Sequence, residues 1–198
     1  MHPNRGYRWE DRAAMRLLVA ELGFGALFAA TSDGPRVAHL PVVWLDDTTL
    51  GLHIARGNAL TRHLDDATAL FVAQGPDGYI SPDWYGTGPD EVPTWNYVAV
   101  ELEGVLRRME RGALVAQIEQ LGAEQEARLP KDPWRLDKVS PQKVAALLNG
   151  IVGYRLEIQA WRGTLKLAQG KSAEARLAAA DGVEAAGRRG IAHWMRAL

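Results

Sequence analysis

Cysteine is absent from all 198 residues of the sequence. That absence excludes disulfide bonds, thiolate metal sites and a cysteine nucleophile, and it fits a reducing compartment. Charge of one sign is not in excess either, because 23 Lys and Arg stand against 24 Asp and Glu, for a formal net charge of -1. We therefore expect no global electrostatic attraction to nucleic acid or to an anionic membrane.

Long hydrophobic runs and familiar catalytic motifs are also missing. No uninterrupted apolar stretch approaches the roughly 18 residues of a membrane span, and the polar beginning, HPNRGYRWEDR, has no secretory core. The sequence contains no HExxH, no GxSxG, no P-loop and no Rossmann glycine spacing. We expect a cytoplasmic protein without a membrane partner or a metal, and no catalytic residue can be assigned.

What the sequence does contain is a β-rich pattern with helices at its beginning, late middle and end. Residues 10–22 place apolar side chains at helical spacing, and Gly23 suits the position after a helix. Six strands are predicted, in the stretches GALFAAT, RVAHLPVVWL, TLGLHIA, ATALFVAQG, TWNYVAVELEGVLRRM and IVGYRLEIQAWRG. Short turns imply an antiparallel meander, and closure into a barrel removes its exposed edges. We predict a mainly β fold with peripheral helices (α+β), built on a six-stranded antiparallel barrel.

The hydrophobic content of 47% is ample for one packed core. We expect residues 1–170 to form one barrel domain with a helical insertion at about 111–148. The Ala-rich residues 171–198 are expected to form a helical tail, broken around Gly187 and Gly190 and packed on the same domain.

Two of the predicted strands, residues 36–45 and 49–55, are apolar on both faces. One small barrel interior cannot bury both faces of both strands, so part of this surface needs another cover. The pattern predicts a homodimer.

A group of hydrogen-bond donors follows the third predicted strand directly. Arg56 offers a planar fork of N–H groups, Gly57 allows close backbone approach, and Asn58 and Thr61 add neutral donors. An ordinary turn has a similar composition. We interpret the segment as a candidate monophosphate cradle.

Aromatic side chains gather in the segment YISPDWYGTGPDEVPTWNY. A long surface loop anchored by aromatics has a similar composition. The rings of Trp84, Tyr85, Trp95 and Tyr97 are of the kind that stacks on a planar ligand, and Asn96 can bond a ring edge. Beside a phosphate cradle, this pattern predicts a pocket for flavin mononucleotide (FMN).

Six motifs now support a family assignment: AHLPV, LHIARGN, YISPDWY, VPTWNYVAVELEG, GIVGYRLEI and GTLKLAQGKS, in this order from about Gly23 to Ser172. Together they resemble the PaiB family of FMN-binding proteins, which are often described as negative transcriptional regulators. The family is similar to the flavin split barrels. The resemblance implies a six-stranded FMN-binding split barrel, a homodimer with the cofactor at the subunit interface, and DNA as a further partner.

The resemblance also implies which residues contact the cofactor. They are His39, Arg56, Gly57, Asn58, Trp95, Asn96, Tyr97, Lys166 and Gln169. In the last block, the usual KLSQN reads KLAQG here, so that Ala168 and Gly170 each remove a polar group.

Three functions remain open on this fold. A regulator is implied by the resemblance, although no helix-turn-helix is predicted and residues 171–198 carry five basic against three acidic side chains. A flavin-dependent oxidoreductase, either a reductase or an oxidase, is the second, because bound flavin carries redox chemistry. A haem-binding or haem-degrading split barrel is the third, with His39, His53 or His63 as the axial ligand.

Overall fold

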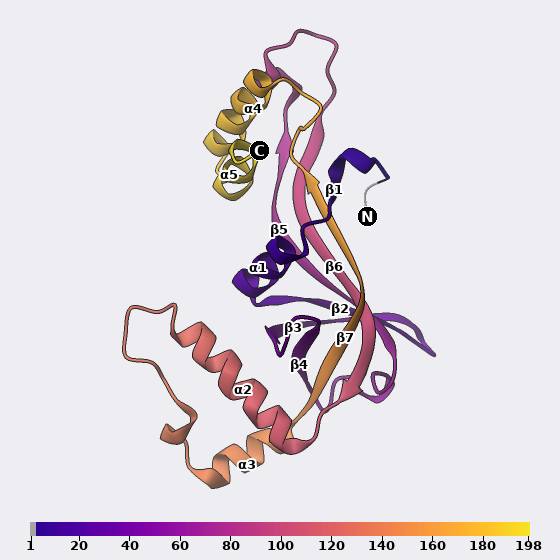
Figure 1. Ribbon diagram of the computed structural model, residues 1–198, viewed down its shortest axis with the longest axis vertical. Helices are drawn as coiled ribbons and strands as arrows, with labels where there is room; N and C mark the ends of the chain where they lie inside the picture. Colours follow the sequence, from indigo (N-terminus) through magenta and orange to yellow (C-terminus); the bar gives the residue numbers. More distant parts are fainter. Residues whose placement is uncertain (1–2) are drawn as a thin grey trace. The chain divides into compact units, whose positions relative to one another are not determined.

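A computed structural model describes residues 3–198 of the chain (Figure 1). Within these residues the strands form one seven-stranded sheet in the order β1-β7-β4-β3-β2-β5-β6, and β7 also pairs with β6. The second pairing closes the six strands β2 to β7 into a cycle, while the two-residue β1 joins the edge of β7. The predicted six-stranded antiparallel barrel with peripheral helices is confirmed, and β1 is an addition to it.

The elements follow the chain in a simple order. The strands are β1 (Arg8–Trp9), β2 (Phe24–Thr31), β3 (Gly34–Trp44), β4 (Thr49–Ala55), β5 (Thr68–Ile80), β6 (Thr94–Arg108) and β7 (Ile151–Lys166). The α-helices are α1 (Arg12–Leu22), α2 (Arg111–Glu126), α3 (Pro141–Asn149), α4 (Ala173–Ala185) and α5 (Arg189–Arg196). Four short 3-10 helices complete them, η1 (Arg5–Tyr7), η2 (Thr61–His63), η3 (Pro82–Tyr85) and η4 (Leu136–Lys138).

The chain divides into two compact units. Unit 1 consists of the chain up to Leu18 with Ala73–Glu101 and Arg162–Leu198, and unit 2 consists of Val19–Val72 and Leu102–Trp161. The long strands β5, β6 and β7 each contribute residues to both units. The predicted domain limits at residues 170 and 171 stay a prediction.

Unit 2 contains most of the barrel and the helices α2 and α3 (Figure 1). Its core includes the fully buried side chains Leu27, Leu50, Phe71, Leu102 and Leu156. Except for Leu50, whose neighbour Gly51 is also buried, these residues alternate with more exposed neighbours along their strands, as expected when one face of a sheet is covered. The alternation of apolar residues in the sequence therefore determines which side chains of the strands point into the barrel.

Closure of the barrel depends on a close approach of β6 to β7. Gly104 lies so near the backbone of Glu157 that an added Cβ would collide with the carbonyl oxygen of that residue. Elsewhere in unit 2, the rings of Trp44 and Trp161 stack with centroids 5.4 Å apart and an interplanar angle of 4°. A glycine at the closure point thus lets two backbones meet where a side chain has no room.

Unit 1 contains the helical pair α4 and α5, which lie side by side in Figure 1. The predicted break at Gly187 is confirmed, since this residue has φ +86° between the two helices. Gly190, the other glycine of the predicted break, is the second residue of α5. A Cβ at Gly190 would come within 2.9 Å of Pro76 Cβ, so a larger residue has no room there.

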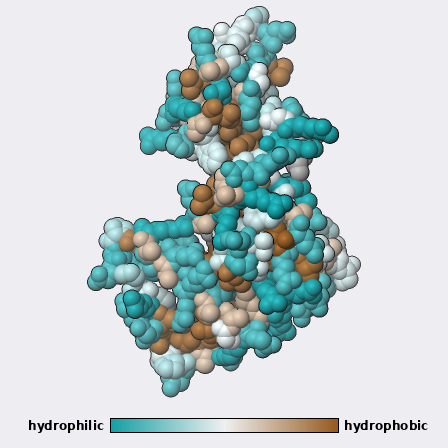
Figure 2. Space-filling model, in the orientation of Figure 1, coloured by the Kyte–Doolittle hydropathy of each residue, from teal (hydrophilic) through white to brown (hydrophobic). Residues whose placement is uncertain are grey.

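In the view of Figure 2, hydrophilic residues predominate and hydrophobic residues form separate patches. Among the helices of residues 3–198, none is both long and apolar enough to cross a membrane.

Candidate functional site

A cavity of about 400 Å³ lies in unit 2, beside the loop that follows β4. Three arginines reach it from different parts of the chain, Arg56 from that loop, Arg62 from η2 and Arg108 from the end of β6. The wall is completed by Gly57, Asn58, Ala59, Thr61, Val152 and Tyr154. The structure therefore brings the predicted phosphate cradle together as one concave and strongly basic site.

Arg56 holds the loop to the junction between α3 and β7. Its Nε donates to the backbone oxygen of Asn149 at 2.8 Å, and its Nη2 donates to that of Ile151 at 3.2 Å. The backbone N–H of Arg56 also donates to the oxygen of Gly150 at 2.8 Å. The guanidinium has five N–H groups in all, so the remaining three are available to an anion in the cavity.

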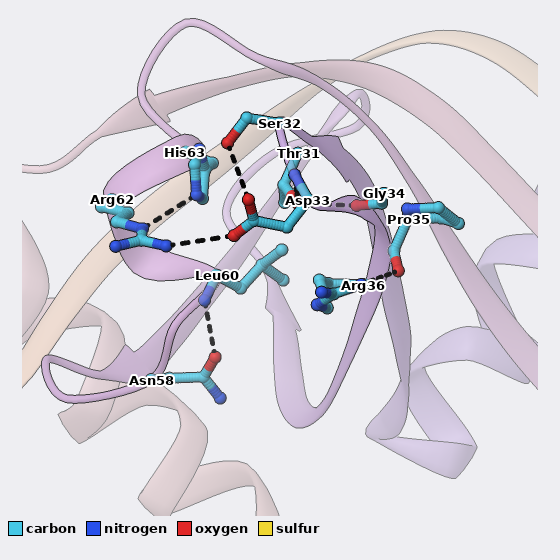
Figure 3. Close-up of polar contacts among 10 residues, drawn as sticks. All are labelled: Thr31, Ser32, Asp33, Gly34, Pro35, Arg36, Asn58, Leu60, Arg62 and His63. Atoms are coloured by element: carbon cyan, nitrogen blue, oxygen red, sulfur yellow. Dashed lines mark hydrogen bonds and ion pairs between the residues drawn. The ribbon is translucent and has the colours of Figure 1, made fainter.

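Arg62 is partly neutralised, as Figure 3 shows. Its Nη2 lies 3.4 Å from Asp33 Oδ2, in the turn between β2 and β3, and its Nε donates to His63 Nε2 at 2.9 Å. Both partners of this ion pair are largely exposed, so solvent screens the interaction. Arg62 therefore has an acidic partner at the cavity, although the interaction is weak.

Arg108, like Arg62, lines the cavity and was not identified by the sequence analysis. Its guanidinium makes no hydrogen bond or ion pair with any residue of the described chain, although its backbone N–H donates to Asp65 Oδ1 at 3.3 Å. It lies near Tyr154, whose hydroxyl donates to the backbone oxygen of Thr61 at 3.1 Å. Burial raises the pKa of Tyr154, so this phenol stays neutral and adds no negative charge.

Asn58 builds the loop rather than pointing its oxygen into the cavity. Its Oδ1 accepts a hydrogen bond from the backbone N–H of Leu60 at 2.9 Å (Figure 3), and its backbone oxygen accepts one from Thr61 at 3.0 Å. This arrangement is the local turn that asparagine favours. The neighbouring Gly57 is exposed, and its N–H makes no hydrogen bond within the described residues.

The block of Trp95, Asn96 and Tyr97 does not form one surface. Because side chains alternate along β6, Asn96 is fully buried whereas Trp95 is 51% exposed. The Trp95 ring meets Tyr79 edge to face, with centroids 6.5 Å apart. Tyr97 is half-buried on the face of the strand opposite to Asn96. The Asn96 amide is therefore buried on one face of β6, while the rings of Trp95 and Tyr97 lie on the other, more exposed face.

Lys166 and Gln169 lie in unit 1, at and just after the end of β7. Lys166 Nζ donates to Thr94 Oγ1 at 2.5 Å. Gln169 folds back on its own turn, where its Oε1 accepts a hydrogen bond from the N–H of Leu167 at 2.8 Å and its Nε2 donates to the oxygen of Leu165. The structure thus places these two residues and Asn96 in unit 1, and the Arg56 group in unit 2.

His39 lies on an exposed apolar face of the barrel. It pairs across strands with Ala26, between the pairs Phe24 with Pro41 and Phe28 with Val37. The exposed fractions are 53% for Phe24, 40% for Phe28 and 44% for Val37. We call Phe24, Ala26, Phe28, Val37, His39 and Pro41 the outer face.

The residues around the arginine cavity fit the phosphate of FMN. The monophosphate is an anion, and the cavity offers one guanidinium without an internal partner, one with three unused N–H groups and an unused backbone N–H at Gly57. Of the three histidines considered as axial ligands of haem, His39 is exposed on the outer face. The half-buried His53 has its Nδ1 3.5 Å from Gln117 Nε2, and His63 Nε2 accepts from Arg62.

The architecture can now be compared with solved structures. The flavocytochrome Anf3 from Azotobacter vinelandii superposes with a TM-score of 0.62 at 12% identity, over 83% of this chain and 72% of that one. The FAD and heme binding protein from Mycobacterium smegmatis gives a TM-score of 0.57 at 16% identity, over 81% and 73%. These similarities establish the split-barrel fold, and at such identities they establish the fold alone.

Within the split-barrel fold, sequence comparison identifies the family of this chain. Residues 1–160 match the family model described as "Putative FMN-binding domain". The chain is also 30% identical over 158 residues to "Protease synthase and sporulation protein PAI 2" of Bacillus subtilis, which covers 78% of this chain and 75% of that protein. A yeast protein, YKL070W of Saccharomyces cerevisiae, is 29% identical over 54% of this chain and 72% of its own length. The chain belongs to the PaiB-like FMN-binding family, whose cofactor is a flavin, as the sequence motifs predicted.

Proposed function

We propose that this protein binds FMN with the cofactor phosphate in the arginine cavity of unit 2. The observation that carries the proposal is Arg108, an arginine that faces this cavity without an internal partner. An unpaired guanidinium beside Arg56 creates a site in which an anion gains charge-assisted hydrogen bonds. Bound flavin would supply electron-transfer chemistry, and the residues of this chain would hold and orient it.

Each group at the cavity has a distinct part in this proposal. Arg56 and Arg108 bind the phosphate oxygens, the Gly57 N–H adds a neutral donor, and Asn58 fixes the loop that presents them. The neutral Tyr154 closes the wall without repelling the anion. Five further residues lie in unit 1 and do not line the arginine cavity, so their contacts with the flavin stay predictions: Trp95, Asn96, Tyr97, Lys166 and Gln169.

The sharpest test is a titration of Arg108→Gln with FMN and with riboflavin, in which the quenching of flavin fluorescence measures binding. Loss of one charge-assisted contact should weaken FMN binding by roughly 10-fold to 100-fold, while riboflavin, which lacks the phosphate, binds as it does to the parent. Arg36→Gln is the matched control, because it removes an exposed arginine of the same unit that does not line the cavity. Equal FMN affinity for the parent and Arg108→Gln would refute the phosphate assignment.

We also propose that two copies of the chain associate through the outer face. The support is an apolar strip across β2 and β3, continued onto β5 where Phe28 pairs with Leu70 and Ala26 with Val72. Exposed apolar strips of this kind on a sheet mark contact surfaces. His39 would then lie within the dimer contact rather than in open solvent.

A regulatory function is the third part of the proposal. It is supported by the resemblance noted in the sequence analysis and by a relative that is named for sporulation, a cellular process. Direct DNA contact by α5 has weak support, because Arg196 pairs with both Asp181 and Glu184. We therefore expect weak, salt-sensitive DNA binding by the purified protein. Rapid reduction of bound flavin by a nicotinamide donor, with multiple turnovers and no DNA binding at any salt concentration, would instead favour an oxidoreductase.

A further inference from the structure

A second cavity of unit 2, of about 490 Å³, lies between α2 and the segment of residues 127–140 that connects this helix to α3 (Figure 1). It shares no lining residue with the arginine cavity, and none of the residues predicted to contact the flavin lines it. Its volume is in the range of sites that bind small organic molecules. The helical insertion therefore contains a candidate ligand site that FMN binding does not explain.

The wall of this cavity opposite α2 is fixed by hydrogen bonds. Arg128, near the start of the connecting segment, donates from both Nη atoms to backbone oxygens at the end of α1, each at 2.7 Å. Further along, Glu126 Oε2 accepts the backbone N–H of Trp134 at 2.7 Å and pairs with Lys131. The cavity is therefore formed before a ligand arrives, and binding does not have to order the segment.

The interior of the cavity is apolar and accessible. Ile118 and Leu136 are half-buried along it, and the Trp134 side chain is 43% exposed. Gly122 lies within α2, where glycine costs about 1 kcal/mol relative to alanine, yet a Cβ there would meet no atom within 4 Å and its φ is not positive. Neither packing nor backbone conformation requires this glycine, and its missing side chain leaves space for a ligand.

Three charged side chains also line the cavity, and none of them makes a side-chain hydrogen bond or ion pair within residues 3–198. Glu119 comes from α2, whereas Arg135 and Asp137 come from the connecting segment. Two carboxylates against one guanidinium give the cavity an excess of negative charge. The face of an exposed tryptophan ring attracts cations as well. The cavity is therefore complementary to a positive charge carried on an apolar body.

We propose that this cavity binds an organic monocation with an aromatic body, the chemistry of an arylalkylammonium. The ammonium group lies near Glu119 and Asp137, and the aromatic body packs against Ile118, Leu136 and the Trp134 ring. The guanidinium at the same cavity offsets one carboxylate, so the site takes one positive charge rather than two. This activity goes beyond FMN binding and does not rest on it.

The test compares four probes by nuclear magnetic resonance titration of the full chain, followed at the Trp134 indole N–H. 2-Phenylethylammonium carries the charge and the ring, 2-phenylethanol lacks the charge, methylammonium lacks the ring, and 3-phenylpropionate carries the opposite charge. We expect 2-phenylethylammonium to bind about fivefold more tightly than 2-phenylethanol, and the other two probes to bind more weakly still. Equal affinity for the amine and the alcohol, or tighter binding of 3-phenylpropionate, would overturn the proposal. So would a Trp134 signal that changes with protein concentration alone, because a second copy of the chain would then occupy the cavity.

Charge variants then assign the binding to these residues. Glu119→Gln combined with Asp137→Asn should weaken binding of 2-phenylethylammonium roughly tenfold. Asp132→Asn is the matched control, because it removes an exposed carboxylate of the same segment that does not line the cavity. Arg135→Gln should tighten binding of the amine about threefold, since it removes a like charge. Weaker amine binding by Arg135→Gln, or parent-like binding by the double variant, would overturn the assignment.

A cavity-filling variant tests the location of the site without changing a charge. Gly122→Leu should abolish binding of the amine and keep at least the parent melting temperature, because leucine is a better helix former than glycine. Parent-like binding of the amine by Gly122→Leu would place the ligand elsewhere and overturn the proposal. The same variant should bind FMN as the parent does, since Gly122 does not line the arginine cavity. A failed phosphate cradle would show instead in Arg108→Gln, so the two failures are distinguishable.

Discussion

Arg56 Nε donates a 2.8 Å hydrogen bond to the backbone oxygen of Asn149, a residue that lies 93 positions further along the chain. The side chain that was predicted only to bind phosphate therefore also joins the loop after β4 to the end of α3. The sequence pattern gave no sign of this second role, since an arginine in a turn has no fixed partner.

The first prediction concerns Arg56→Ala, which should affect both stability and binding. Loss of two exposed side-chain hydrogen bonds to backbone oxygens should lower the free energy of unfolding by about 1 kcal/mol. FMN affinity should fall roughly 30-fold through the lost phosphate contact, while riboflavin affinity changes little. Urea unfolding and flavin titration measure the two effects separately.

Arg56→Lys serves as the companion variant. It keeps the charge but loses the planar fork, so it should recover only part of the FMN affinity. If FMN and riboflavin affinities fell equally in Arg56→Ala, Arg56 would act through the shape of the loop, and the phosphate contact would be excluded.

The second prediction concerns the outer face. Phe28→Lys places a charge at the centre of the apolar strip, so the protein should sediment as a monomer near 21.7 kDa while its parent sediments as a dimer. The fold should persist, because Phe28 is already 40% exposed. Leu147→Lys on α3 is the matched control, since Leu147 is 61% exposed in the same unit but outside the outer face. A parent that sediments as a stable monomer at micromolar concentration would contradict the dimer.

The third prediction is a pH dependence that arises from His53. Burial lowers the pKa of His53 below its ordinary value of 6.5, so the folded state favours the neutral ring. As the pH falls below about 6.5, the unfolded state takes up a proton that the folded state does not, and stability decreases with acidification. The loss continues until the pH reaches the lowered pKa of the folded protein.

Urea midpoints at pH 7.5 and pH 5.5 measure this effect. His53→Gln keeps a polar side chain opposite Gln117 without a titrating ring, so its midpoint should change less between the two pH values. Parallel pH profiles for His53→Gln and the parent would show that other groups cause the loss.

Much of the fold could be predicted because its determinants are local. The alternation of Val98, Val100 and Leu102 with Ala99, Glu101 and Glu103 predicts a half-buried strand, and the first three are fully buried in β6. The turn before Pro35 and the apolar runs around it predicted the hairpin of β2 and β3. In each case the period of the sequence and the geometry of the strand coincide.

The candidate site was predictable only where its residues are neighbours in the chain. Arg56, Gly57 and Asn58 were found because one short loop carries all three. Arg108 and Tyr154 reach the cavity from β6 and β7, and no spacing rule connects those strands to the loop. The opposite placement of Trp95 and Asn96 did have a signal, since adjacent residues of a strand point to opposite faces.

The division of the chain has a consequence for any attempt to dissect the protein by deletion. Unit 1 is assembled from three stretches of sequence and unit 2 from two, and β5, β6 and β7 pass from one to the other. No single cleavage point releases either unit whole, and a truncation after Trp161 removes part of unit 1 together with the last residues of β7. Point substitutions, rather than fragments, are therefore the appropriate means of assigning a function to each unit.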